Sequence, residues 1–226
     1  GNNAPASVTV GASANYTFGG SGSITGSGSL VKTNTGTLTI TNVNAFSGGV
    51  IIAGGVLEAG NLAIGGSPSS IGAAGVDPAK LVIDGGTLRY TGAPVSIDRP
   101  ATLGATGTVD IPSGTSLTTS GTIGGGGLTK IGNGLLALSS ANSYTNGSVI
   151  NAGTLQFNNN TAAGTGGITN NAAAMLIQGA LVLDNLVDFE GNCALEFNGV
   201  GAKNTALRGA WVGDGTARVP HARSSE

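Results

Sequence analysis

The chain has 226 residues, enough for one sizeable core or for an elongated repeat, and 42 of them are glycine. The glycines do not recur at every third position, which excludes collagen. Short runs of Val, Ile and Leu recur along the chain, which disfavours disorder. The formal net charge is only -2, and nine scattered Lys and Arg form no basic stripe, which excludes nucleic acid as a partner.

Residues 1–25 are predicted to form N-terminal edge or capping strands. The stretch from Gly1 to Val31 contains no charged side chain, and it carries no basic and apolar leader, so we expect any export signal to lie outside it. Natural sheet edges are usually guarded by Lys, Pro or a covering helix, and only Pro5 fits here. We therefore predict a self-association edge, with a head-to-tail contact at the other end of the chain. Its residues are Val8, Val10, Tyr16, Phe18 and Trp211.

Two segments, residues 26–59 and 124–157, align without a gap. A pattern kept at this spacing implies the same local structure twice and is typical of solenoid units. A shorter phrase in 81–92 repeats the closing strand of each copy. The matched pairs include Leu30 with Leu128, Lys32 with Lys130, Leu38 with Leu136, Asn44 with Asn142, Phe46 with Tyr144 and Leu57 with Leu155.

Within each copy the apolar period is two, which predicts strands of about four to six residues between Gly, Asn and Ser turns. Gly, Thr and Asn disfavour helix throughout. We expect Asn44 and Asn142 to stack in an amide ladder and Thr37, Thr39 and Thr41 to form hydroxyl ladders outside. The pairs expected inside are Leu38 with Leu136, Ile40 with Leu138, and Leu57 with Leu155.

Three features resemble sites but are interpreted as structural. The glycine run 124–127 lacks the Lys-Ser/Thr of a phosphate loop and precedes no helix, so it is predicted to be a turn. Asp98 with Arg99, and Asp84 with Arg89, are expected to be ion pairs at turns, because no His, Cys or second carboxylate accompanies them.

The densest acidic stretch lies between residues 181 and 197. Its odd positions are apolar, so in an extended chain its acids point to the outer face; a weak cation or sugar site is the alternative. Cys193, on the apolar parity, is expected to be an inert core thiol, and as the single cysteine it excludes a disulfide framework and a Cys-based zinc site. The acids are Asp184, Asp188, Glu190 and Glu196.

Residues 201–226 are predicted to be a C-terminal cap or tail. Trp211 is expected to cap the last coil, with contact to a partner as the alternative. The only histidine, His221, leaves no His cluster and no Ser-His-Asp system. The most apolar stretch, 172–189, is interrupted by Gln178, Gly179 and Asp184, so no membrane insertion is expected.

The two repeat copies, residues 26–59 and 124–157, resemble the autotransporter-associated β-strand repeat of bacterial passenger domains. That unit reads roughly G-x-G-x-L-x-K-x-G-x-G-x-L-x-L, then a short Asn-containing turn, then a G-T-L strand, which here are 124–138, 142–147 and 153–155. The earlier copy departs at Asn34 and Val56. The resemblance implies a secreted or surface-exposed right-handed parallel β-helix without cofactor or catalytic residues. The membrane barrel that ends such proteins needs more residues and aromatics than follow residue 157.

The sequence therefore predicts an all-β, right-handed parallel β-helix, or β-solenoid, in one elongated domain: 1–25 edge, 26–200 helix, 201–226 cap or tail. The predicted function is a non-catalytic structural or adhesive module outside a bacterium or on its surface. No cofactor, metal or catalytic residue is expected. Self-association, neighbouring coils of a longer chain, or a host or matrix surface are the expected partners. The alternatives are a filament subunit stacking head-to-tail and a polysaccharide lyase or hydrolase.

Overall fold

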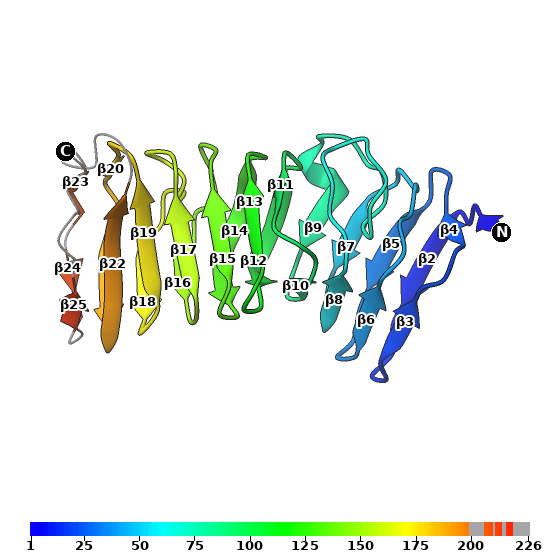
Figure 1. Cartoon of the computed structure of the whole chain (residues 1–226), viewed down its shortest axis with the longest axis horizontal. Coiled ribbons are helices and arrows are strands. Elements are labelled where there is room, and N and C mark those ends of the chain that lie inside the picture. Colours follow the sequence, from blue (N-terminus) through cyan, green and yellow to red (C-terminus); the bar gives the residue numbers. More distant parts are fainter. Residues whose placement is uncertain (199–205, 210, 214–215, 219–226) are drawn as a thin grey trace.

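The computed structural model describes residues 1–198, 206–209, 211–213 and 216–218. In this part of the chain the only helix is a single 3₁₀ turn, η1 (Pro78–Lys80), and all other regular structure is β. The strands stack side by side along the long axis, with the first and last strands of the chain at opposite ends of the stack (Figure 1). The prediction of an all-β parallel solenoid is confirmed, with about 10 coils.

The strands are short, as the Gly, Asn and Ser punctuation predicts. In the first half they are β1 (Asn2–Asn3), β2 (Ser7–Val10), β3 (Tyr16–Phe18), β4 (Ser23–Ile24), β5 (Ser29–Lys32), β6 (Thr37–Ile40), β7 (Val50–Ile52), β8 (Val56–Ala59), β9 (Leu81–Ile83), β10 (Thr87–Tyr90), β11 (Val95–Ile97) and β12 (Ala101–Asp110). The second half has β13 (Ser116–Thr119), β14 (Ile123–Ile131), β15 (Leu135–Leu138), β16 (Ser148–Ile150), β17 (Thr154–Phe157), β18 (Ile168–Asn171), β19 (Ala174–Gln178), β20 (Val182–Leu183), β21 (Val187–Glu190), β22 (Asn192–Asn198), β23 (Ala206–Leu207), β24 (Trp211–Val212) and β25 (Thr216–Arg218).

Successive coils pair in parallel at a nearly fixed spacing. Leu30 pairs with Val50, and Leu128 pairs with Ser148, so one coil takes 20 residues in both places. The step from Val50 to its partner Leu81 is 31 residues, because a long loop leaves the stack between β8 and β9. One sheet has 14 strands and a second has seven.

Each sequence repeat spans two coils rather than one. In the first copy, β7 pairs with β5 and β8 pairs with β6, so four strands make two stacked layers. The second copy does the same with β14 to β17. The predicted solenoid unit is therefore a pair of coils, because the aromatic turn and the closing strand of the pattern lie in different layers from its opening strands.

The two copies are rotated by one face about the solenoid axis. The inward column that contains Leu38 of β6 runs on through Leu57, Leu88 and Val109 to Lys130 of β14. Lys130 matches Lys32 of β5, so the face built by the second strand of copy one continues into the first strand of copy two. The change of face takes place in β12 and β14. The first half of β12 pairs with β9 and its second half pairs with β10, and both halves pair with β14 around an irregular step at Leu103 and Thr106.

The glycine run 124–127 makes this face change possible. It was predicted to be a turn, but it lies inside the continuous strand β14. Gly125 has a φ of 96°, a conformation that L side chains rarely adopt, and a Cβ on Gly126 would collide with the carbonyl oxygen of Gly104 in the coil before. The run is therefore a sharp corner within a strand, made where two backbones approach closely.

The core is a narrow strip inside the stack. The six leucine and isoleucine residues expected to face the interior are all buried, at most 2% exposed, so the predicted register is confirmed. Each such side chain stabilises the fold by about 2 kcal/mol through burial. They are Leu38, Ile40, Leu57, Leu136, Leu138 and Leu155.

The matched asparagines do not stack on each other as predicted. The Oδ1 atom of Asn44 accepts from the Ile24 backbone N–H at 2.8 Å, and that of Asn142 accepts from Ile123 at 2.8 Å, in each case in the coil before. The predicted threonine ladders are also wrong: Thr39 donates to Glu58 and Thr41 donates to the Phe18 carbonyl. A buried backbone N–H without a partner is costly, so each asparagine oxygen accepts from one instead of stacking, while the two threonine hydroxyls donate to acceptors of neighbouring coils.

Candidate functional site at the N-terminal end

The N-terminal end of the solenoid is open. Strands β1, β2 and β3 each pair with one strand of the following coil, β4, β5 and β6, and have no partner on their other side within the described residues. These three edges face the same end of the stack (Figure 1). Unpaired edges of this kind are templates for pairing with another strand.

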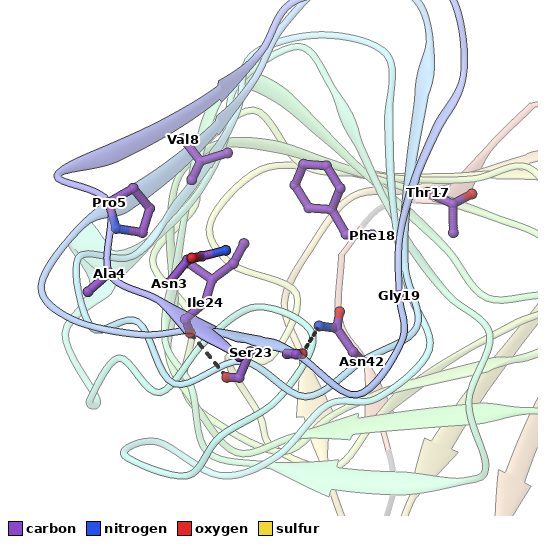
Figure 2. A pocket seen from close by; sticks show the side chains of 12 residues that line it. Asn3, Ala4, Pro5, Val8, Thr17, Phe18, Gly19, Ser23, Ile24 and Asn42 are labelled. Atoms are coloured by element: carbon purple, nitrogen blue, oxygen red, sulfur yellow. Dashed lines mark hydrogen bonds between the residues drawn. The ribbon is translucent and has the colours of Figure 1, made fainter.

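The edges surround a hollow of about 770 Å³. Figure 2 shows Val8, Phe18 and Ile24 directed into it, with Asn3 and Pro5 at its rim. The hollow is the interior of the first coil, seen where no further coil covers it. Its wall therefore combines apolar side chains with strand edges that are ready to accept and donate backbone hydrogen bonds.

Four of the residues predicted for the self-association edge lie in inward columns at this end. Val8 pairs with Leu30, Val10 with Lys32, Tyr16 with Leu38 and Phe18 with Ile40, and all four of these partners are at most 1% exposed. Tyr16 is 50% exposed, while Val8, Val10 and Phe18 are half-buried. The four occupy core positions that lack a coil above them.

Asparagine side chains fasten this first coil to the second at the corners. Asn34 donates to the Gly11 carbonyl at 2.7 Å, and Asn42 donates to the Gly22 carbonyl at 2.6 Å, the latter visible in Figure 2. The Asn15 side chain accepts from the Thr37 N–H at 2.8 Å. These bonds hold the edge strands in place without closing the end.

The fifth predicted edge residue, Trp211, lies at the opposite end of the stack. It begins β24 and pairs with Val187, and its side chain is outside what the structure describes. Residues 199–205 and 219–226, with His221 among them, also lie outside the described residues. Strands β23, β24 and β25 each pair with one earlier strand, so the described part of this end also carries three strands.

Two buried lysines were not recognised from the sequence. Lys32 and Lys130 are 1% and 0% exposed. The Lys32 Nζ donates to the carbonyls of Thr33, Asn34 and Gly54, and the Lys130 Nζ donates to those of Ile131, Gly132 and Ala152. Both ammonium groups thus tie the turn of one coil to the next. The signal was available, because each lysine stands two residues after an inward leucine.

Burial also shifts the acid–base behaviour of these lysines. Desolvation lowers the pKa of Lys130 to about 8, partly opposed by the Asp110 carboxylate, and it lowers the pKa of Lys32 in the same direction. Lys130 is therefore partly neutral near pH 8, although its role is to hold a turn.

The acidic stretch has the predicted parity. Asp184 and Glu196 are exposed, Asp188 and Glu190 are half-buried, and the odd-numbered apolar residues between them face inward, whereas Leu186 is exposed. The Asp188 Oδ1 is buried and has no hydrogen-bond partner among the described residues. No group of three or more His, Cys, Asp or Glu suited to a metal occurs in the described residues. Cys193 is buried and its Sγ donates to the Asn170 carbonyl at 3.0 Å, as expected of a core thiol.

The predicted ion pairs at turns are formed differently. Arg89 pairs with Asp110 and Glu58 rather than with Asp84. Asp98 and Arg99 both hold the long loop after β8: Asp98 accepts from the Gly65 N–H at 2.6 Å, and Arg99, 4% exposed, donates to four loop carbonyls. The sequence could not show these partners, because the pairing register between coils decides them.

Comparison with known proteins supports the repeat interpretation. The passenger-associated-transport-repeat family matches residues 30–59 and 128–157. The adhesin BmaC autotransporter of Brucella suis biovar 1 (strain 1330) is 45% identical over 112 residues, which cover 48% of this chain and 3% of that adhesin. No solved structure matches the chain. Among the described residues, no helix has the length and apolar character needed to cross a membrane.

Proposed function

Because this chain is an autotransporter passenger-repeat protein that lies outside the cell or on its surface, we propose that it is a non-catalytic structural section of a bacterial surface adhesin. In this role the solenoid is a stiff spacer that extends the protein away from the cell.

The continuity of the stack carries this proposal. The column that passes from Leu38 to Lys130 goes on through Ile150 and Asn170 to Phe189 without an interruption in pairing. In such a solenoid each coil contacts only its neighbours, so force along the axis acts on the layer-to-layer ladders and packed columns. Small side chains and many glycines suit this arrangement, since they let coils approach closely.

The absence of catalysis is supported by the placement of the acids. A lyase or hydrolase needs carboxylates and a base converging on one substrate. The four acids of residues 184–196 are instead spread over β21, β22 of the second sheet and the turn before β21. Incubating the chain with pectin and alginate tests this directly: we expect no unsaturated products, and their appearance would establish a lyase.

We also propose that the N-terminal edge pairs with a further solenoid coil by β-augmentation. Three parallel edges around one hollow match a coil of the same cross-section better than any single strand, and no charged side chain lines the hollow. The coil is that of a second copy or of a longer chain. Sedimentation and negative-stain imaging over a range of concentrations distinguish the two, because only a second copy gives particles that lengthen with concentration.

A matched pair of variants sharpens this test. Val8→Lys places a charge at the hollow, whereas Val76→Lys places one at an exposed valine of the long loop after β8, away from the edge strands. If copies stack, the first change is expected to abolish concentration-dependent lengthening and the second to preserve it. Equal lengthening of both variants would exclude the edge as the contact.

The structural role is tested by pulling single molecules from their two ends. A continuous stack is expected to resist and then release coils in successive steps of roughly equal length. Extension at negligible force would show that the chain is not a mechanical spacer, whatever its N-terminal edge binds.

A further inference from the structure

A second hollow, of about 620 Å³, lies on the outer face of the solenoid near its middle. It runs across the carboxyl ends of β8, β10 and β12 and is bounded by the turns that follow β12, β14 and β16. The register aligns Glu58, Arg89 and Asp110 as neighbours on successive coils. We call this surface the Arg89 groove.

Arg89 at the centre of the groove is only partly engaged. Its Nε donates to Asp110 Oδ2 at 2.6 Å, whereas its Nη1 lies 3.6 Å from Glu58 Oε2, beyond a normal hydrogen bond. The Arg89 side chain is 37% exposed, that of Glu58 24% and that of Asp110 6%. The terminal N–H groups of the guanidinium therefore face the groove, while Asp110 holds the guanidinium plane in place.

The bordering turns add uncharged polar groups. Ser113 and Asn133 are exposed, and their side chains make no hydrogen bond within the described residues. Together with Thr91 they supply two hydroxyls and an amide beside the carboxylates and the guanidinium. Donors and acceptors thus alternate over a short distance across the groove.

This combination selects against ions. Two carboxylates flank the single exposed cation, so a phosphate, sulfate or acidic sugar meets repulsion on both sides, and the guanidinium between the carboxylates prevents them from converging on a metal ion. A neutral molecule with many hydroxyls satisfies both kinds of group at once. We propose that the Arg89 groove is a contact site for neutral glycan.

The first repeat shows that the groove is not required by the fold. Val10 pairs with Lys32 in the following coil, and Val109 pairs with Lys130 in the same way. The residue after the valine in the sequence is Gly11 in the first case and Asp110 in the second. The stack closes equally well around both lysines. The row formed by Glu58, Arg89 and Asp110 is therefore a feature of this part of the stack and not a requirement of the fold, as expected of a contact surface on a repeat scaffold.

An array of neutral gluco-, manno- and galacto-oligosaccharides, with sulfated and sialylated ones beside them, tests the proposal on the whole chain. We expect binding of a neutral oligosaccharide with a Kd of about 1 mM or tighter. Because the ligand is uncharged, this Kd is expected to change less than about twofold between low and high salt.

Variants locate the site. Arg89→Gln is expected to weaken binding at least about tenfold and Asn133→Ala about threefold, each the loss of hydrogen bonds to the ligand. The matched controls Arg208→Gln and Asn61→Ala change exposed residues outside the groove and are expected to bind as the unmodified chain does.

Several results would overturn the proposal. They are no neutral glycan bound at millimolar concentration, a preference for the sulfated or sialylated probes, or groove variants that bind as well as their controls while melting at the same temperature. None of these bears on the structural role, which the pulling experiment tests separately.

Discussion

The two copies of the repeat bury the same kinds of residue at matched positions, although they lie in different parts of the stack. Both bury a lysine, an asparagine and an aromatic ring at matched positions, although copy one lies next to the open end and copy two lies in the middle of the stack. Lys32 and Lys130 each donate to three turn carbonyls with the same geometry. The features common to both copies are therefore those that a pair of coils requires.

One difference between the copies involves two residues that compensate each other. Tyr144 replaces Phe46, and its hydroxyl lies 2.7 Å from the Ser148 Oγ; the residue matched with Ser148 in copy one is Val50. All four side chains are at most 2% exposed. A buried hydroxyl needs a partner and a buried phenyl ring needs none, so Tyr occurs with Ser and Phe with Val. Each ring packs on a glycine of the next coil, Gly72 or Gly164.

A charge in the core should have the largest effect. Leu136→Asp places an unpaired carboxylate at a site that is 2% exposed and is expected to destabilise the chain by about 4 kcal/mol or more. Leu38→Asp is expected to do the same in copy one. Urea unfolding followed by circular dichroism measures both; a loss below 1 kcal/mol in either would contradict the shared register.

Removing a turn lysine should come next. Lys130→Met takes the donor from three carbonyls and is expected to cost about 3 kcal/mol, and Lys32→Met a similar amount. Lys80→Met, at a half-buried lysine in the 3₁₀ turn η1, serves as the control and is expected to change stability by less than about 0.5 kcal/mol. If Lys32→Met were as mild as the control, the two lysines would not have the same role.

The lysine of copy two should also give stability a pH dependence. Its pKa is about 8 in the folded chain and near its ordinary value, 10.5, when unfolded, so the unfolded chain binds more protons between these values. Stability is then expected to rise with pH from 8 to 10.5, by at most about 3 kcal/mol, relative to Lys130→Met. Denaturant titrations across this range measure the difference; parallel curves for the two proteins would contradict a lowered pKa.

The aromatic pairs should show the smallest effect. Ser148→Val leaves the Tyr144 hydroxyl with only the Ala162 carbonyl, at 3.2 Å, as a partner, and is expected to cost about 1 kcal/mol. Adding Tyr144→Phe recreates the pair found in copy one and is expected to recover most of that loss. A double-mutant cycle with a coupling energy near zero would show that the two residues vary independently.

The sequence was sufficient to predict the strands, their parity and the stacked parallel core, because a period of two on either side of glycine turns leaves few alternatives. It did not show the coil length, since the 34 residues of each repeat in 26–59 and 124–157 cover two layers. It also did not show the face change at Gly125 and Gly126, which depends on how strands of neighbouring coils pair. Local patterns determine strands, and register between coils determines their partners.

The candidate site was predictable in part. The charge-free N-terminal stretch indicated an exposed edge, and the structure places Val8 and Phe18 at the hollow and Val10 and Tyr16 on the same two edge strands. The buried lysines were missed because lysine is rarely buried, so its inward parity was not used. The Arg89 groove was out of reach, because Glu58, Arg89 and Asp110 are neighbours only once three coils are stacked.

Hydrogen exchange measured peptide by peptide is the most direct test of the central claim, which is a solenoid closed in its middle and open at its N-terminal end. At low protein concentration, amides of β2 and β3 are expected to exchange within minutes, while those of β14 to β17 remain protected to the limit set by global unfolding. Protection of residues 7–18 equal to that of residues 123–157 in a monomer would show that the end is covered and contradict the account.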